Sequence, residues 1–299
     1  MYKTEKVNDI EIKPIIHQKF DKKTVQGFEY FPNPYNNIAL VARTKSGKTN
    51  CIYRALEATL KKNTNVVIIC PSVNTDATYK KMKSMIKKKE CNLTVHEHFE
   101  EKNVNHIENL VKRLSAKAEK KDGSKEQLPH GKVDLGLSMD DILFSHAPQI
   151  ENVSEIVVSG GGETQPKSKP EKKKKGKLAP EYVLIIDDLS SLCRHKSITR
   201  LLCKSRHLKM RVFVAIHSIM DLQPAAWGQL ANIFLFPNIS EERVEQVADK
   251  CGLSFKGDTK KRRVLCDLYD QATAEPYNFL NCNTQEMTFK KNFNEQFQV

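Results

Sequence analysis

Short, uninterrupted runs of apolar residues recur along the chain and predict buried strands. A run without alternating polar positions is typical of a strand that is covered on both faces of a parallel sheet. The runs lie at residues 38–42, 66–70, 183–186, 212–216 and 233–236.

Helical periodicity follows most of these runs. Behind the first run, Ile52, Leu56 and Leu60 repeat at the spacing of one helix face. Similar patterns predict helices within residues 78–89, 104–120, 198–208 and 240–251. Strands that alternate with helices imply an α/β fold with a mostly parallel sheet flanked by helices. In such sheets, ligands bind at the carboxyl ends of the strands.

Local composition divides the chain into an interrupted core with appendages. Residues 1–36 are predicted to form an N-terminal arm, and residues 37–90 the first part of the core. Residues 91–180 read as an insertion that is partly helical and then rich in Lys and Gly. Such a basic stretch cannot bury a core and is expected to be disordered. Residues 181–255 complete the core, and residues 256–299 form a basic, strand-containing extension.

Overall composition fits an intracellular globular protein of 299 residues, with 39% hydrophobic residues and a mean hydropathy of -0.53. No apolar run approaches the roughly 18–20 residues that span a bilayer. The first residues lack the apolar core of a secretion signal. Eight cysteines are scattered singly without a Cys-x-x-Cys pair, which favours reduced thiols.

The formal net charge of +13 favours a polyanionic partner, nucleic acid above all. The alternative is that the charge serves solubility. Much of the excess lies in the Lys-rich insertion, so the charge alone does not establish DNA binding.

The first apolar run leads directly into a loop with the composition of a phosphate-binding P-loop. Its residues are Thr44, Lys45, Ser46, Gly47, Lys48 and Thr49. Gly47 lets the backbone approach a phosphate without a Cβ, and consecutive N–H groups converge on the anion. Lys48 is expected to neutralise the β- and γ-phosphates of ATP, and the Thr49 hydroxyl to ligate Mg²⁺. The following helix points its N-terminus at the phosphate. Together these features predict a P-loop NTPase fold of the RecA-like type.

One position departs from the full pattern Gly-x-x-x-x-Gly-Lys-[Ser/Thr], because Ala42 stands where the pattern has its first Gly. Alanine is the mildest replacement. A chance Ser-Gly-Lys-Thr sequence in a surface turn is the alternative interpretation. The strand before the loop and the helix after it favour the P-loop.

Two acids follow the run at residues 183–186. A P-loop enzyme requires a strand that ends in an acid to hold Mg²⁺, and Asp187 has that position. The next residue, Asp188, is placed to polarise an attacking water, although Asp reaches about one methylene less far than the more usual Glu. An acidic turn after a core strand is the alternative. The pair Asp140 and Asp141 follows no apolar run and is a weaker candidate.

Two further polar residues flank the run at residues 212–216. His217 follows it, where a polar side chain can sense the γ-phosphate or orient water; a merely exposed or hydrogen-bonded histidine is the alternative. Arg206 precedes it and is a candidate arginine finger for the γ-phosphate of a neighbouring subunit; an ordinary surface arginine is the alternative. Since Lys48, Asp187 and His217 all follow strands, we expect one cleft to hold them.

Several stretches resemble the genome-packaging ATPases of poxviruses and other large nucleocytoplasmic DNA viruses and virophages, a branch of the FtsK–HerA class of P-loop motors. They lie at residues 46–49, 66–74, 184–189, 205–218 and 231–240. The last two are the most specific, because generic P-loop proteins do not share them. The likeness extends over about residues 36–90 and 181–252, under half of the chain.

The resemblance implies an ATP- and Mg²⁺-dependent motor that assembles as a homo-oligomeric ring, a pentamer or hexamer. Such a motor translocates double-stranded DNA into a preformed capsid, at the portal vertex. It implies no membrane span and a location in the host cytoplasm, in a virus factory, or in the nucleus, with association with the virion as a further option. In this family pattern Lys48 and Thr49 bind phosphate and metal, Asp187 holds the metal and Asp188 activates water. His217 corresponds to the γ-phosphate sensor.

The chain departs from the family in three places. Ala42 replaces the usual first Gly, and His217 stands where the class commonly has Gln. The stretch at residues 228–232 lacks the Arg that the family usually shows there, which leaves Arg206 as the preferred finger.

Two other functions remain open from the sequence. One is a P-loop kinase for a nucleotide or small molecule, although no arginine-rich lid is evident. The other is a basic, non-hydrolysing protein that binds DNA or a capsid and carries a degenerate P-loop; Ala42 and the Lys-rich insertion are its support.

Overall fold

The computed structural model describes residues 20–122, 177–253 and 259–298 of the chain. The chain divides into two units, and the larger comprises residues 1–119 and 176–299. Of the smaller unit only the end of one helix is described. The Lys- and Gly-rich part of the predicted insertion lies outside the described residues, as do Asp140 and Asp141, and its predicted disorder stays a prediction.

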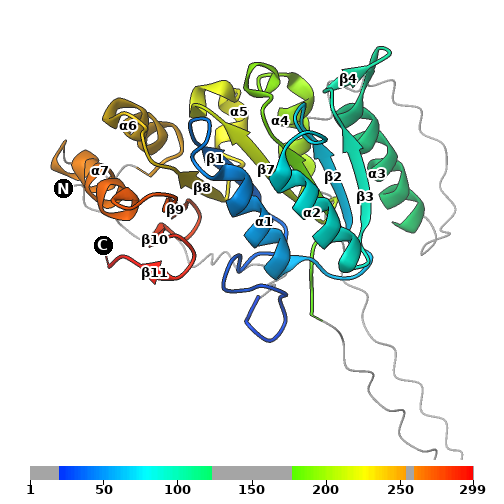
Figure 1. Ribbon diagram of the computed structural model, residues 1–299, viewed down its shortest axis with the longest axis horizontal. Helices are drawn as coiled ribbons and strands as arrows, with labels where there is room; N and C mark the ends of the chain where they lie inside the picture. Colours follow the sequence, from blue (N-terminus) through cyan, green and yellow to red (C-terminus); the bar gives the residue numbers. More distant parts are fainter. Residues whose placement is uncertain (1–19, 123–176, 254–258, 299) are drawn as a thin grey trace, which may run out of the picture. The chain divides into compact units, whose positions relative to one another are not determined.

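Nine of the described strands form one large sheet (Figure 1). They are β1 (Asn37–Val41), β2 (Asn65–Ile69), β3 (Asn92–His96), β6 (Tyr182–Ile186), β7 (Met210–Ile216), β8 (Asn232–Leu235), β9 (Leu280–Asn283), β10 (Thr288–Lys291) and β11 (Glu295–Gln296). Their order is β11-β10-β9-β8-β1-β7-β6-β2-β3. The strands from β8 to β3 run parallel, and β9 to β11 continue the sheet with antiparallel pairing. Strands from the two described segments are thus interleaved: β1 lies between β8 and β7, and β6 lies between β7 and β2.

Helices cover both faces of this sheet. They are α1 (Lys48–Thr59), α2 (Ala77–Lys88), α3 (His106–Asp122), α4 (Lys196–Lys204), α5 (Pro224–Trp227), α6 (Glu241–Lys250) and α7 (Thr259–Thr273). Helices α1 and α2 pack on one face (Figure 1). Ile52 of α1 and Met82 of α2 belong to one buried cluster on that face. Helices α3 to α7 contribute to the cluster on the other face, with Leu201 and Val247 among its residues. The fold is therefore α/β, with a large, mostly parallel sheet flanked by helices, as the sequence predicts.

Smaller elements connect these layers. They are the strands β4 (Glu100–Glu101) and β5 (Val104–Asn105) and the 3-10 turns η2 (Ser190–Leu192) and η3 (Ile219–Asp221). Strands β4 and β5 pair with each other as a separate hairpin. No helix in the described part of the chain combines the length and the apolarity that crossing a membrane requires.

The central strands show why their sequences are apolar throughout. Every residue of β1 and β7 is buried. Successive side chains of a strand point to opposite faces, so Leu40 packs in the cluster with α1 and α2, and Val41 in the cluster on the other face. Because helices cover both faces, both sets of side chains are apolar.

The ordered core continues beyond residue 90, where the sequence places the start of an insertion. Strand β3 pairs in parallel with the whole of β2. It is the last strand of the described sheet, and its residues alternate between exposed and partly buried positions over most of its length. Polar residues therefore interrupt it, and it lacks the apolar run that marks the central strands. The next helix, α3, packs Ile107, Leu110 and Leu114 into the core.

Candidate phosphate- and metal-binding site

The strands that carry the candidate residues end along one edge of the sheet. Strand β7 lies between β1 and β6 and pairs in parallel with both. The residues that follow these three strands are Ala42, Asp187 and His217. Because the three strands are parallel and adjacent, these residues lie next to one another at the carboxyl edge of the sheet, although they are far apart in the sequence.

The loop after β1 has the backbone of an anion-binding site. Lys45 has a φ of 64° and Gly47 a φ of 99°, both in the left-handed region. Left-handed residues in a tight loop form the concave nests of N–H groups that hold anions. Gly47 is also the N-cap of α1, so the free N–H groups of the first helical turn open onto the loop. Lys48 is only 7% exposed. A phosphate bound in this loop would supply a negative charge to pair with its ammonium group.

Ala42 does not have to be a glycine in this backbone. Its φ lies outside the left-handed region. The residue is fully buried, and its N–H donates to the carbonyl oxygen of Ile216 at 2.9 Å. The departure from the full P-loop pattern therefore imposes no backbone strain.

A hydrogen-bonded cluster surrounds the carboxylate of Asp187. The Thr49 hydroxyl lies 3.3 Å from Asp187 Oδ2, and the Tyr79 hydroxyl donates to the same oxygen at 2.7 Å. The other oxygen accepts the N–H of Asp188 at 3.0 Å. Asp187 is 1% exposed, and burial raises its pKa, while the hydrogen bond from Tyr79 acts in the opposite direction. The loop hydroxyl and the strand acid are thus within reach of one cation.

Asp188 faces outward beside this cluster. Its backbone is left-handed, with a φ of 57°, and its side chain is exposed. The Ser72 hydroxyl, from the loop after β2, donates to Asp188 Oδ2 at 3.2 Å. The Asp188 carboxylate is therefore exposed at the edge of the site and is hydrogen-bonded to Ser72.

The oxygen donors at this edge fit Mg²⁺. The Thr49 hydroxyl and the carboxylates of Asp187 and Asp188 are hard oxygen ligands, the kind that this cation prefers. The sulfur of Cys70 lies within 4.8 Å of both carboxylates. Burial raises the pKa of the Cys70 thiol, however, and a neutral thiol is a poor metal ligand. The donor set therefore suits magnesium rather than a thiolate-bound metal.

The His217 ring is tied to the loop. Its Nδ1 lies 3.0 Å from the carbonyl oxygen of Ala42, and its backbone N–H donates to Asp221 Oδ2 at 2.9 Å. Because a carbonyl oxygen only accepts, Nδ1 carries a proton in this contact, and Nε2 is left for another partner. A neutral ring can then accept from a water through Nε2, whereas donation to a phosphate oxygen requires the imidazolium.

Arg206 does not lie at this edge. It is exposed in the turn before β7, whereas His217 follows β7. The strand has seven residues, so its first and last residues lie about 20 Å apart at the usual rise of about 3.3 Å per residue. Arg206 therefore does not reach the nucleotide site of its own chain, and a role toward a neighbouring subunit is left as a proposal.

Two residues at the site were not identified from the sequence. Tyr79 stands on the buried face of α2, with Met82 and Ile86, and its polar tip at the start of an apolar helix face is the signal that marks it. Ser72 follows the apolar run of β2 and Pro71, and nothing in the sequence indicates its contact with Asp188.

A scan of protein-family models and a search of curated proteins gave no match to this chain. Among solved structures, the chain is similar to the genome packaging NTPase B204 from Sulfolobus turreted icosahedral virus 2. Its complex with ATP-gammaS is 15% identical with a TM-score of 0.45, and its complex with AMP is 16% identical with a TM-score of 0.47. The DNA-packaging ATPase B204 from Sulfolobus turreted icosahedral virus is 14% identical with a TM-score of 0.46. Each match covers 87% of this chain and 97% of the other.

Proposed function

We propose that this protein is a Mg²⁺-dependent ATPase that translocates double-stranded DNA and works as a homo-oligomeric ring in packaging a viral genome. The observation that carries the proposal is the 3.3 Å contact between Thr49 and Asp187, which joins a phosphate loop to a strand acid 138 residues away. This contact supports a common Mg²⁺ for the two residues.

Each residue of the site has a role that its position supports. Lys48 and the loop N–H groups bind the β- and γ-phosphates, and Thr49 with Asp187 holds Mg²⁺. Asp188 polarises the attacking water, and His217 orients that water or senses the γ-phosphate. Bound Mg²⁺ would neutralise charge that develops on the phosphates.

Helix α2 supports the assignment of DNA as the partner. Its exposed residues include four lysines, and none of them forms an ion pair with another described residue. They are Lys80, Lys81, Lys87 and Lys88. At 100° per residue these positions fall within about 120° of the helix circumference, opposite Tyr79, Met82 and Ile86. Such a stripe suits the regularly spaced phosphates of a DNA backbone.

The packaging part of the proposal follows the sequence resemblance to viral packaging ATPases. It includes the capsid portal vertex as a partner, Arg206 as a finger toward a neighbouring subunit, and a location in the infected cell or the virion. A native mass measurement with ATP and DNA present gives the ring size.

ATP hydrolysis by the full-length chain, measured with and without double-stranded DNA, tests the enzymatic proposal. Turnover of the wild type should rise when DNA is added. Lys48→Ala removes the phosphate ligand and Asp188→Ala removes the candidate base, so each should lower DNA-stimulated turnover by about 100-fold or more.

Asp267→Ala is the matched control, because it removes an exposed acid from helix α7. It should leave turnover unchanged. Absence of hydrolysis by the assembled wild type would contradict the proposal. Transfer of phosphate to a small acceptor without DNA would favour a kinase.

A further inference from the structure

An exposed tyrosine lies against the phosphate loop. Tyr277 is 70% exposed, in the turn between α7 and β9. Its ring atom Cδ1 is 3.3 Å from the point where a Cβ on Gly47 would lie. Strand β9 begins at Leu280, which pairs with Leu235 at the carboxyl end of β8, so this turn belongs to the same sheet edge as the loop.

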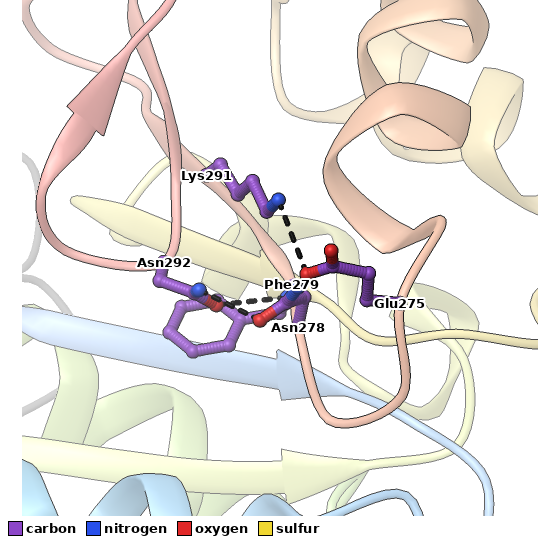
Figure 2. A network of polar contacts seen from close by, with 5 residues as sticks. All are labelled: Glu275, Asn278, Phe279, Lys291 and Asn292. Atoms are coloured by element: carbon purple, nitrogen blue, oxygen red, sulfur yellow. Dashed lines mark hydrogen bonds and ion pairs between the residues drawn. The ribbon is translucent and has the colours of Figure 1, made fainter.

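A network of polar contacts holds this turn in place (Figure 2). Asn292 accepts the N–H of Phe279 at 3.1 Å and donates to Asn278 Oδ1 at 2.8 Å. Glu275 accepts from the Asn278 amide at 2.8 Å and from Lys291 Nζ at 3.4 Å. Phe279 is itself buried. The turn that presents Tyr277 is therefore braced on both sides, while the tyrosine ring is left exposed.

The backbone at Tyr277 is unusual for an aromatic residue. The N–H of Asn278 bonds to the carbonyl oxygen of Glu275 at 3.3 Å, which defines a four-residue turn with Pro276 at its second position. Tyr277 occupies the third position with a φ of 67°. Turns of this type favour Gly or Asn there, and a bulky residue is strained. A strained residue that its surroundings hold in place is a reason to look for a function.

The location of Tyr277 matches the nucleoside end of a bound nucleotide. In the sheet, β7 and β6 lie on one side of β1, and β8 and β9 on the other. The candidate metal and γ-phosphate groups, Asp187 and His217, follow β6 and β7. A triphosphate that lies across the loop with its γ-end beside them would direct its nucleoside toward the side of β8 and β9, where Tyr277 stands.

We propose that Tyr277 stacks against the adenine base of bound ATP and contributes base affinity that the phosphate loop does not supply. This inference rests on the proposed function, because it requires the triphosphate to occupy the loop. An exposed aromatic face is the usual protein platform for a nucleobase, since every base presents a π-face.

The test compares ATP with inorganic tripolyphosphate, both with Mg²⁺, by calorimetric titration of the full-length chain. Tyr277→Ala should weaken ATP binding about tenfold or more, because it removes a stacking contact. It should leave the affinity for tripolyphosphate, which has no base, within about twofold of the wild type. Tyr277→Phe retains the ring and should bind both ligands nearly as the wild type does.

Met287→Ala is the matched control. Met287 is also exposed, at 38%, and left-handed, with a φ of 52°, but it lies in the turn between β9 and β10 at the opposite edge of the sheet. This variant should bind both ligands normally. Unchanged ATP affinity in Tyr277→Ala would overturn the inference, as would equal affinity of the wild type for the two ligands.

Lys48→Ala separates this inference from the proposed function. It should lower the affinity for both ATP and tripolyphosphate, because both occupy the phosphate loop. If Lys48→Ala bound both as the wild type does, the loop assignment itself would be wrong. If Lys48→Ala bound neither ATP nor tripolyphosphate while Tyr277→Ala bound ATP normally, the loop assignment would stand and the stacking role would be refuted.

Discussion

The Tyr79 hydroxyl helps to position the acid that we assign to the metal. Tyr79 gives Asp187 its shortest hydrogen bond among the described residues, at 2.7 Å. Burial raises the pKa of Tyr79, so its O–H stays protonated and can only donate to the carboxylate. Groups that hold a metal ligand in orientation influence metal affinity without touching the metal.

Replacing Tyr79 with Phe should therefore weaken the response to Mg²⁺. The ring stays in the core and only the donor is removed. We expect the half-saturating Mg²⁺ concentration for ATP hydrolysis to rise by roughly 10-fold or more. Titration of turnover against Mg²⁺ at saturating ATP measures the change.

Tyr53→Phe provides the control, because its hydroxyl lies 3.5 Å from Glu57 on the same helix and does not contact Asp187. An unchanged Mg²⁺ dependence in Tyr79→Phe, or an equal change in both variants, would show that Tyr79 serves only the core.

At the residue scale, the sequence predicts those site residues that directly follow a strand or belong to the loop after one. Thr49 and Asp187 meet because parallel pairing aligns the strands that precede them, and that alignment follows from apolar runs. Contacts from loops do not follow from such a pattern. Ser72 and Tyr277 reach the site through turns whose path depends on packing.

At the scale of elements, helix α2 joins a basic surface to the site. Its buried face carries Tyr79 to Asp187, and its exposed face carries the lysine stripe. Lys87 and Lys88 in the last turn also complement the helix dipole. Lys80 lies near the N-terminus of the helix, where a positive charge is unfavourable, so helix stability does not explain it.

Removal of two stripe lysines should reduce the salt dependence of DNA binding. In a Lys80→Ala/Lys87→Ala double variant, the slope of log affinity against log salt should fall by about 2, since each lysine that contacts a phosphate contributes about one unit. Fluorescence anisotropy with a labelled duplex at several salt concentrations measures the slope.

Lys196→Ala/Lys204→Ala removes the same charge from α4, whose apolar residues pack on the opposite face of the sheet. It should leave the slope nearly unchanged. Equal losses in the two double variants would mean that the protein binds DNA through its net charge rather than through α2.

The sequence predicts best the elements whose surroundings are uniform, because uniform burial produces a clear pattern of apolar residues. The central strands have apolar runs because both faces are covered. Helix α6 begins after Ser240 as expected, although that hydroxyl makes no capping bond, and Gly252 has the left-handed φ of a helix terminator. Strand β3 does not follow from the sequence, because it is the last strand of the described sheet and its exposed and partly buried positions leave no apolar run.

At the scale of the whole molecule, a line of buried polar groups crosses the sheet. Arg211 donates to Asn36, Asn36 to Asn232, and Asn232 to Asn281, so the line extends from β7 to β9. The guanidinium lies 4.5 Å from the ring of Phe31. Its described hydrogen-bond partners are amide and carbonyl oxygens, without a carboxylate. Burial lowers the pKa of Arg211 to about 9.

This buried cation should make stability depend on alkaline pH. Above about pH 9 the folded state releases a proton that the unfolded chain still binds, so the free energy of unfolding gains up to about 1.4 kcal/mol per pH unit. Arg211→Met lacks this titration. The difference in unfolding free energy between the wild type and the variant should therefore shift in favour of the wild type as pH rises.

Urea unfolding of both proteins on either side of that pH measures the difference, in which the other titrating groups largely cancel. A difference that stays constant with pH would show that Arg211 keeps its proton in the folded state.

The interleaving of strands from two chain segments determines how the molecule can be divided. A fragment that ends at residue 122 would hold the phosphate loop without its acid, and one that starts at residue 177 would hold the acid without the loop. Each would expose unpaired strand edges inside an incomplete sheet. The two fragments should therefore complement each other when expressed together, with ATP binding regained only on reassociation, because every strand of the described sheet belongs to one fragment or the other.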